Sequence, residues 1–244
     1  MKDDRTSRRR QSFRKNLTAA FTLVEMLTVM GVVSVLIAIA VPNMRGINQT
    51  AARRNAVTGV MNALDRARVM AISDGRATYV VFARKTDGPT QVNSSLWGQG
   101  YAIFQDKDNI DFQPIQITPW LYLPNSMAFK VNNILSVMNR PIDGNDPEFP
   151  LTASAGTGKA RLPYMKFEPT GMVDDRSISQ SSEYLRVLMF PGSISSSGAE
   201  VANQSGGVST AVLLEEIDIK PMTGRAQYVA DPVDNLATPT PTPN

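Results

Sequence analysis

Residues 21–41 form an apolar run, FTLVEMLTVMGVVSVLIAIAV, in which Glu25 is the one ionisable residue. In a helix this run is about 31 Å long, the thickness of the hydrocarbon core of a bilayer. It therefore predicts a transmembrane helix over residues 21–42. An acidic side chain within such a span is costly and marks a functional site that needs a partner. Glu25 is the first candidate functional residue.

The helical pattern continues beyond the apolar run. Pro42 has no amide hydrogen and disfavours helix at the residue before it, so a helix kink or break is expected there. Residues 43–74 then carry one apolar stripe with alternating spacings of three and four, formed by Val57, Val60, Leu64, Ala67 and Ala71. Such a stripe is typical of a helix that packs against a sheet. Gly75 is expected to end the helix.

Five β-rich runs follow the helix, at residues 77–84, 100–106, 164–169, 184–190 and 211–220. Turn residues separate the first two runs, which are predicted to pair as a hairpin. Pro, Gly, Ser and Asn are frequent at 133–163 and 191–209, which predicts surface loops. The pattern predicts an α+β fold, with the second half of a long N-terminal helix packed on an antiparallel sheet. This domain would span residues 43–230, followed by a disordered Thr/Pro tail at 231–244.

The basic charge is concentrated at the N-terminus. The chain has 25 basic and 22 acidic residues, and seven of the basic residues lie within the first 20 positions, which form a basic leader. The rest of the chain is slightly acidic, so no nucleic-acid partner is expected. A basic flank before an apolar span stays in the cytoplasm, which places the chain after Pro42 on the other side of the membrane.

Composition argues against an enzyme. The chain has no histidine and no cysteine, which removes the commonest general base, thiol nucleophiles and the usual zinc ligands. The glycine-containing stretch ASAGTGKA at 153–160 lacks residues that a phosphate-binding loop requires. No cofactor and no catalytic residue is expected.

Two acidic features remain as weak candidates for chemistry. Asp106, Asp108 and Asp111 lie close together in a predicted turn and could supply oxygen ligands to calcium, although the motif lacks the glycine and the glutamate of an EF-hand. The neighbouring pairs Asp174-Asp175 and Glu215-Glu216 are expected to point to opposite faces of a strand, which argues against a catalytic carboxylate pair.

Three interpretations of the N-terminus are open from the residues. The apolar run could be an ordinary signal anchor. It could instead be a secretory signal peptide, because Ala38-Ile39-Ala40 offers a small-x-small cleavage site. Either would suit a membrane-anchored or secreted extracytoplasmic binding domain. The third interpretation considers the basic prefix, Ala20, FTLVEML and Pro42 together.

This combination resembles the N-terminus of a type IV prepilin or a type II secretion pseudopilin. The resemblance implies cleavage between Ala20 and Phe21 by a prepilin peptidase, followed by N-methylation of Phe21. It also implies that Glu25 pairs with the N-terminal amine of a neighbouring subunit, so that two buried opposite charges satisfy each other. The family usually has glycine where this chain has Ala20, so slower cleavage is expected.

Internal stretches resemble one subgroup, the H-type minor pseudopilins and related minor pilins. They are residues 62–82, 97–112 and 165–173. The resemblance implies a pilin-like subunit of the bacterial inner membrane, with a cytoplasmic N-terminus and a periplasmic domain. Its expected partners are the prepilin peptidase and methyltransferase, other pseudopilin or pilin subunits, the inner-membrane assembly platform and the lipid bilayer. The choice among secretion, pilus and DNA-uptake machinery is left open.

Overall fold

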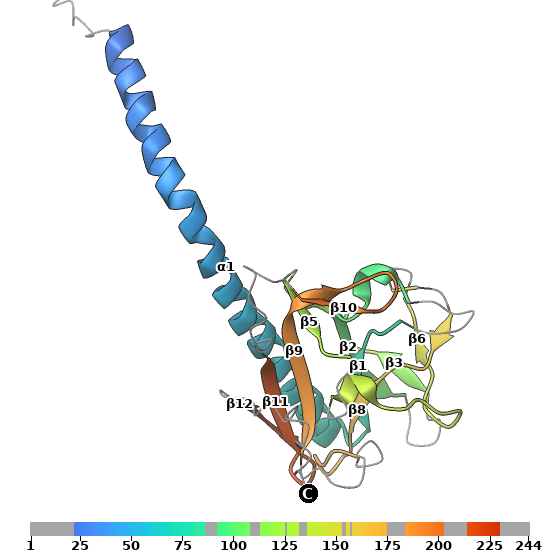
Figure 1. Ribbon diagram of the computed structural model, residues 1–244. Coiled ribbons are helices and arrows are strands. Elements are labelled where there is room, and N and C mark those ends of the chain that lie inside the picture. Colours follow the sequence, from blue (N-terminus) through green and yellow to red (C-terminus); the bar gives the residue numbers. More distant parts are fainter. Residues whose placement is uncertain are drawn as a thin grey trace, which may run out of the picture. The chain divides into compact units, whose positions relative to one another are not determined.

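A computed structural model describes the chain in segments (Figure 1). The described residues are 22–85, 92–107, 113–124, 126–131, 136–152, 155–156, 158–174, 184–202 and 214–229, without the side chains of 39–49. The predicted leader, Phe21 and the predicted tail lie outside them. The chain divides into two compact units, residues 1–45 and 46–244, which are treated separately below.

One helix, α1 (Leu23–Asp74), belongs to both units. It ends as predicted at Gly75, whose φ of 64° is a conformation that glycine adopts without strain. The helix is continuous through Pro42, so the break allowed by the sequence does not occur. A kink at Pro42 stays a prediction. No helix formed by residues with described side chains is long and apolar enough to cross a membrane. The predicted span includes Phe21 and residues 39–42, which lie outside that set.

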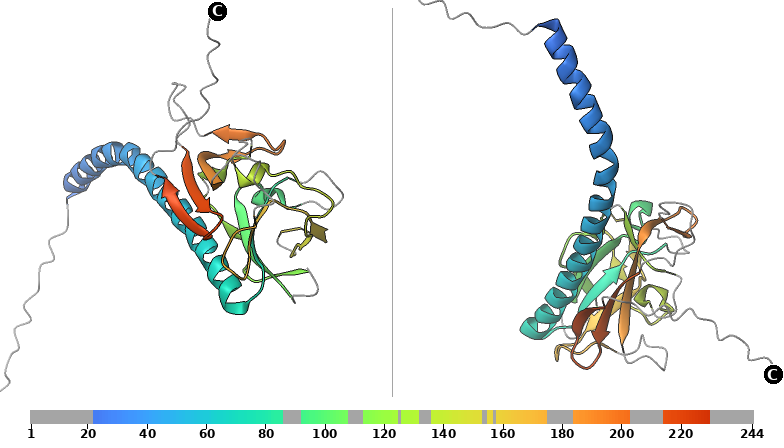
Figure 2. Two further views of the ribbon diagram at one scale, coloured as in Figure 1. Left: turned by 90° about the horizontal axis from the view of Figure 1, so that it is seen from below. Right: turned by 60° about the vertical axis from the view of Figure 1, so that its left-hand side comes forward.

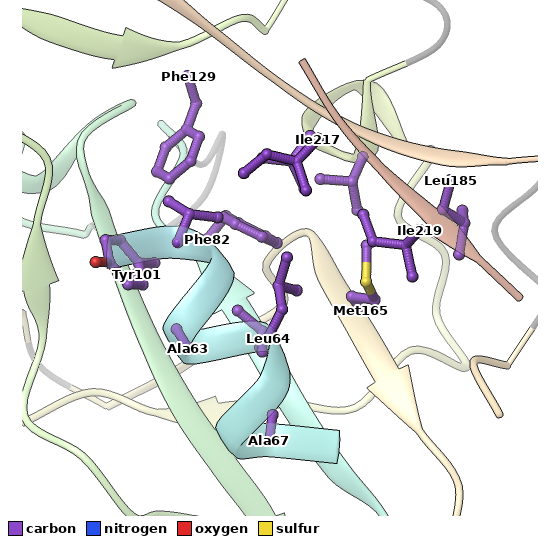
Figure 3. Packing of buried hydrophobic residues seen from close by; sticks show 14 of the residues in the cluster. Ala63, Leu64, Ala67, Phe82, Tyr101, Phe129, Met165, Leu185, Ile217 and Ile219 are labelled. Carbon is purple, nitrogen blue, oxygen red and sulfur yellow. The ribbon is translucent and has the colours of Figure 1, made fainter. Parts of the chain in front are cut away.

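In the second unit, the predicted stripe of α1 is buried. Val60, Leu64, Ala67 and Ala71 are fully buried, and Val57 packs against the same core. Ala56 and Ala63 are also buried and widen the stripe, because their small side chains allow strands to approach the helix closely. Figure 3 shows Leu64 facing residues from several strands. The predicted packing of helix on sheet is confirmed.

The predicted hairpin forms part of a five-stranded antiparallel sheet. Its strands are β1 (Thr78–Phe82), β2 (Gly100–Asp106), β3 (Pro114–Gln116), β4 (Leu121–Tyr122) and β8 (Tyr164–Phe167). The main order is β3-β2-β1-β8, and β4 also pairs with β2. In the hairpin, Val80 lies opposite Ile103.

A second antiparallel sheet also has five strands, which the prediction of a single sheet missed. They are β5 (Met127–Phe129), β9 (Leu185–Ile194), β10 (Glu200–Ala202), β11 (Glu215–Lys220) and β12 (Arg225–Val229). The order is β10-β9-β11-β12, with β5 also on β9. Figure 2 shows β11 and β12 beside the second half of α1.

All five predicted β-rich runs contain strands, but both predicted loop regions also contain regular structure. Residues 133–163 include a short 3-10 helix, η2 (Val137–Asn139), and the two-stranded sheet of β6 (Phe149–Pro150) and β7 (Lys159–Ala160). A further 3-10 helix, η1 (Ser94–Leu96), precedes β2. The other predicted loop, 191–209, contains the end of β9 and all of β10. These pieces are too short, or too rich in Pro and Gly, to show a periodic pattern.

The core has two buried clusters that meet at β1. Val80 and Phe82 belong to the cluster under α1, whereas Tyr79 and Val81 belong to a second cluster with Phe104 and the small sheet. Successive side chains of a strand point to opposite faces, so β1 contributes to both clusters. This explains why all five of its residues are buried.

Candidate functional site

The first candidate site is the start of α1, in the first unit. The backbone N–H of Glu25 donates to the side-chain oxygen of Thr22 at 3.3 Å and to its carbonyl oxygen at 3.1 Å. Thr22 is therefore the N-cap, and Glu25 is at the third helical position. Threonine followed three residues later by glutamate is the sequence of a capping box. Glu25 thus lies in the first turn, where the helix dipole favours a negative charge.

The turns that follow expose apolar side chains on all sides. Every residue from Thr22 to Ala38 is exposed, and Leu23 and Val24 have exposed fractions of 80% and 72%. This range contains eleven exposed large hydrophobic side chains, at Leu23, Val24, Met26, Leu27, Val29, Met30, Val32, Val33, Val35, Leu36 and Ile37. A helix that is apolar all round is typical of a membrane span or of a bundle interior.

The polar side chains of this segment are satisfied within the helix, except for Glu25. The hydroxyl of Thr28 donates to the carbonyl oxygen of Val24 at 2.8 Å, and that of Ser34 donates to Met30 at 2.7 Å. Such bonds remove the need for water around the helix. Among the described residues, the carboxylate of Glu25 has no hydrogen-bond donor and no cation beside it. The predicted cleavage site, Ala20 and Phe21, lies outside the described residues.

The second candidate site is a groove in the second unit, between α1 and the β11–β12 hairpin. Its volume is about 480 Å³, and Thr50, Arg53, Arg54, Val57, Thr58, Glu215 and Tyr228 line it. The Tyr228 hydroxyl donates to Glu215 Oε2 at 2.6 Å, and Arg53 Nη1 lies 3.6 Å from Glu215 Oε1. Val57 thus adds an apolar side chain to a lining that otherwise consists of polar and charged residues.

Asp106 does not lie in a turn as predicted. It ends β2, is buried, and accepts a hydrogen bond from the Tyr79 hydroxyl at 3.2 Å on Oδ2, while Oδ1 has no partner among the described residues. Burial raises the pKa of the Asp106 carboxyl and that of the Tyr79 hydroxyl. Asp108 and Asp111 lie outside the described residues, so the calcium hypothesis stays untested. In the described ranges, no group of three His, Cys, Asp or Glu side chains could hold a metal ion.

The adjacent acids of β11 have separate partners. Glu215 contacts Arg53 of the helix, whereas Glu216 lies 3.1 Å from Nε of Arg186 on β9. They point to opposite faces of the strand, as expected. Asp174 lies 3.5 Å from Lys166, and Asp175 is outside the described residues.

Sequence reasoning missed two features of these sites. The cap at Thr22 was recognisable, since threonine three residues before glutamate at the start of an apolar run is a local signal. The groove was not, because Arg53 and Tyr228 are 175 residues apart and only the fold brings them to the same acid. Comparisons with protein-family models, curated proteins and solved structures find no match.

Proposed function

We propose that this protein is a minor pseudopilin or minor pilin, a structural subunit of a type II secretion pseudopilus or a related filament. Cleavage between Ala20 and Phe21 and methylation of Phe21 would produce the mature subunit. The first half of α1 would then hold it in the inner membrane and later in the helical bundle of the filament. The globular unit would lie in the periplasm.

The observation that carries the proposal is the apolar helix between Thr22 and Ala38, in which every residue is exposed and Glu25 is the one ionisable side chain. The described residues of the first unit do not cover these side chains, which would contact water unless something else buried them. A bilayer or neighbouring helices of the same kind would bury them. The same environment would penalise an unpaired carboxylate, which supports a cationic partner for Glu25.

The proposed cut explains the source of that cation. Hydrolysis after Ala20 would create an ammonium group on Phe21, which immediately precedes the helix cap at Thr22. An ammonium is unfavourable beside the N-terminus of its own helix, because both are positive. Pairing with the carboxylate of a neighbouring subunit would relieve this charge. The subunit itself would perform no catalysis, since the peptidase and methyltransferase would carry out the covalent steps.

A second candidate function is a membrane-anchored or secreted extracytoplasmic binding domain. Two observations favour it: the groove beside Glu215, and the capping position of Glu25, which gives this acid a role within its own helix. In that case the N-terminus would be an ordinary anchor or signal peptide.

Mass spectrometry of the mature N-terminus tests the proposal. The full chain would be produced in a bacterial host with and without an active prepilin peptidase, and extracted from membranes. A peptide that begins with N-methyl-Phe21 only in the presence of the peptidase is the expected result. A chain that begins at Val41 would instead identify a signal peptide, and an uncut prefix in both hosts would identify a plain anchor. Either result would exclude the filament proposal.

A further inference from the structure

Two acids of the second sheet lie on the face of β11 that points away from the core. Glu216 and Asp218 alternate along the strand with Ile217 and Ile219, which pack in the core beside α1 (Figure 3). In the register of the sheet, Asp218 lies opposite Arg186 of β9. The Nε atom of this arginine lies 3.1 Å from Glu216 Oε1 and 3.4 Å from Asp218 Oδ1. Two carboxyl groups thus share one guanidinium.

The hydrogen bonding of this pair of acids is incomplete. Asp218 Oδ1 and Arg186 Nε are both buried, and neither has a hydrogen-bond partner among the described residues. The side chain of Glu216 is only 6% exposed, so water has little access to it. An ionised carboxylate can only accept hydrogen bonds, so two ionised acids cannot satisfy each other, and a buried acceptor without a donor is costly. A proton on Glu216 would supply the donor that Asp218 Oδ1 lacks.

The neighbouring strands bring no second cation to the two acids. The other residues directly opposite them on β9 and β12 carry no charge; they are Leu188, Gln227 and Val229. The next titratable groups along these strands are Tyr184, which precedes β9, and the paired residues Lys220 and Arg225. In the described ranges, neither Lys220 nor Arg225 forms an ion pair with Glu216 or Asp218. One guanidinium and two carboxyl groups therefore set the charge of this site.

We propose that Glu216 and Asp218 share one proton, and that this proton acts as a clasp between β11 and β9 that is released as the pH rises through neutrality. With the proton bound, the pair carries one negative charge, which Arg186 balances. Without it, two buried like charges compete for the same cation. Burial, and then the contact with Asp218, raise the pKa of Glu216 to about 7, whereas Arg186 lowers it. The inference does not depend on a membrane or a filament.

The clasp would control how firmly the β11–β12 hairpin holds α1. On its other face β11 carries Glu215, which lies 3.6 Å from Arg53 of the helix. The turn between β11 and β12 supplies the carbonyl oxygen of Thr223, to which Arg68 of the helix donates at 2.7 Å. Loss of the proton would weaken the attachment of the hairpin to β9, so the hairpin would open more often. Each opening would also break these contacts with α1.

Hydrogen exchange tests the clasp. Full-length protein in detergent would be exchanged at about pH 5 and about pH 8, and rates corrected for the intrinsic effect of pH would be compared between peptides from β11–β12 and from β1–β2. In the open hairpin Glu216 would have an ordinary pKa, so the opening constant of β11–β12 should increase at least about tenfold between these two pH values. It should also stay larger than that of β1–β2, because the hairpin would open without the rest of the unit.

Matched variants assign the effect to the pair of acids. Glu216→Gln provides a permanent N–H donor without a charge, so its hairpin should exchange as slowly at the higher pH as at the lower. Asp218→Asn removes the like charge and should move the midpoint of the pH effect down by about one unit or more, whereas Arg186→Gln removes the cation and should move it up. Glu215→Gln, on the same strand but on its other face, should keep the wild-type pH effect. Circular dichroism would verify that each variant is folded.

Three results would overturn the proposal. Corrected exchange of the wild-type hairpin that does not depend on pH would show that no proton is released in this range. A wild-type pH effect in Glu216→Gln would assign the proton to another group. Equal protection of β11–β12 and β1–β2 at both pH values would show that the whole unit opens together, without a separate clasp. None of these results bears on the processing of the N-terminus, so the proposed function is tested independently.

Discussion

A Cβ atom on Gly224 would lie 2.2 Å from the carbonyl oxygen of Gly171. Gly224 belongs to the turn between β11 and β12, and Gly171 belongs to the turn after β8. The two five-stranded sheets therefore approach each other closely at these two turns. Arg68 of α1 reaches the same point, where its Nε donates to the carbonyl oxygen of Thr223 at 2.7 Å. Helix α1 and the two five-stranded sheets therefore lie close together at this point.

Replacing Gly224 should destabilise the globular unit. Gly224→Ala places a methyl group against the backbone and imposes strain at a φ of 63°, with an expected total cost of about 2–4 kcal/mol. Gly75→Ala is the matched control, because its φ of 64° is equally strained but nothing lies within 4 Å of the added atom. It should cost only about 1–2 kcal/mol. Thermal melts that show equal losses for both variants would exclude the close contact.

Leu64 should be essential for the packing of helix on sheet. Leu64→Ala removes a fully buried side chain and should cost roughly 2–5 kcal/mol, and Leu64→Asp should unfold the unit. Arg66→Asp changes an exposed position of the same helix and should have little effect on stability. Circular dichroism melts of a protein that begins at Asn43 provide the comparison, and equal melting temperatures would contradict the buried stripe.

The main architecture was predictable because its signals are local. The stripe that includes Leu64 repeats over several turns, and the β1 and β2 runs are continuous and flanked by turn residues. The second sheet was not predictable as a separate layer. Its assembly depends on contacts distant in sequence, such as Ala128 with Phe190 and Ile217 with Val187. No local pattern encodes such pairs.

Stability should decrease between about pH 4.5 and 7 through Glu216. Burial, and then a hydrogen bond with Asp218, raise the pKa of Glu216 to about 7, although Arg186 opposes the shift. The folded state therefore binds more protons than the unfolded state in this window, and its stabilisation is complete below the unfolded pKa and lost as the pH rises through 7. Glu216→Gln should flatten this slope, which we expect to be on the order of 1–2 kcal/mol. Denaturant unfolding at several pH values would measure it, and an unchanged slope would assign it to other groups.

Glu25→Gln should separate the two roles of this acid. Glutamine keeps the backbone N–H that donates to Thr22 but carries no charge, so the helix and its membrane insertion should persist while incorporation beside partner subunits decreases. Thr22→Val is the complementary change, because it removes the cap at a cost of about 1 kcal/mol and retains the charge. Co-purification of neighbouring subunits would measure the incorporation of both variants. Normal assembly of Glu25→Gln would show that the charge of Glu25 is not needed for pairing between subunits.

The size of residue 20 should control processing. Ala20→Gly should be cleaved at least as well as the wild-type chain, whereas Ala20→Leu should remain uncut, because we expect the peptidase to accept only a small side chain before the cut. Intact mass after co-expression with a prepilin peptidase measures the processed fraction. Equal processing of the leucine variant would exclude Ala20-Phe21 as the cleavage site.

Of the candidate sites, the N-terminal one could be proposed from the sequence and stays a prediction, whereas the groove could not be proposed from the sequence. Glu25 is conspicuous because an apolar run surrounds it, so its environment is visible in the sequence. Asp106 shows the opposite case, since DKDNID suggests a solvated turn, whereas the fold buries Asp106 against Tyr79. The position of a polar residue relative to the end of a strand depends on pairing, which composition does not specify.

Strand β1, which contributes to both core clusters, must be protected from aggregation before folding is complete. Residues 77–83, ATYVVFA, are uncharged and rich in β-formers, a composition that favours intermolecular pairing whenever the segment is exposed. Cations flank this segment on both sides, at Arg76, Arg84 and Lys85. Such residues act as gatekeepers against aggregation. In the folded chain Arg76 and Arg84 bind carbonyl oxygens of Lys107 and Met138. The arginines that would protect the nascent strand from aggregation thus also bind backbone carbonyl groups on both sides of the folded strand.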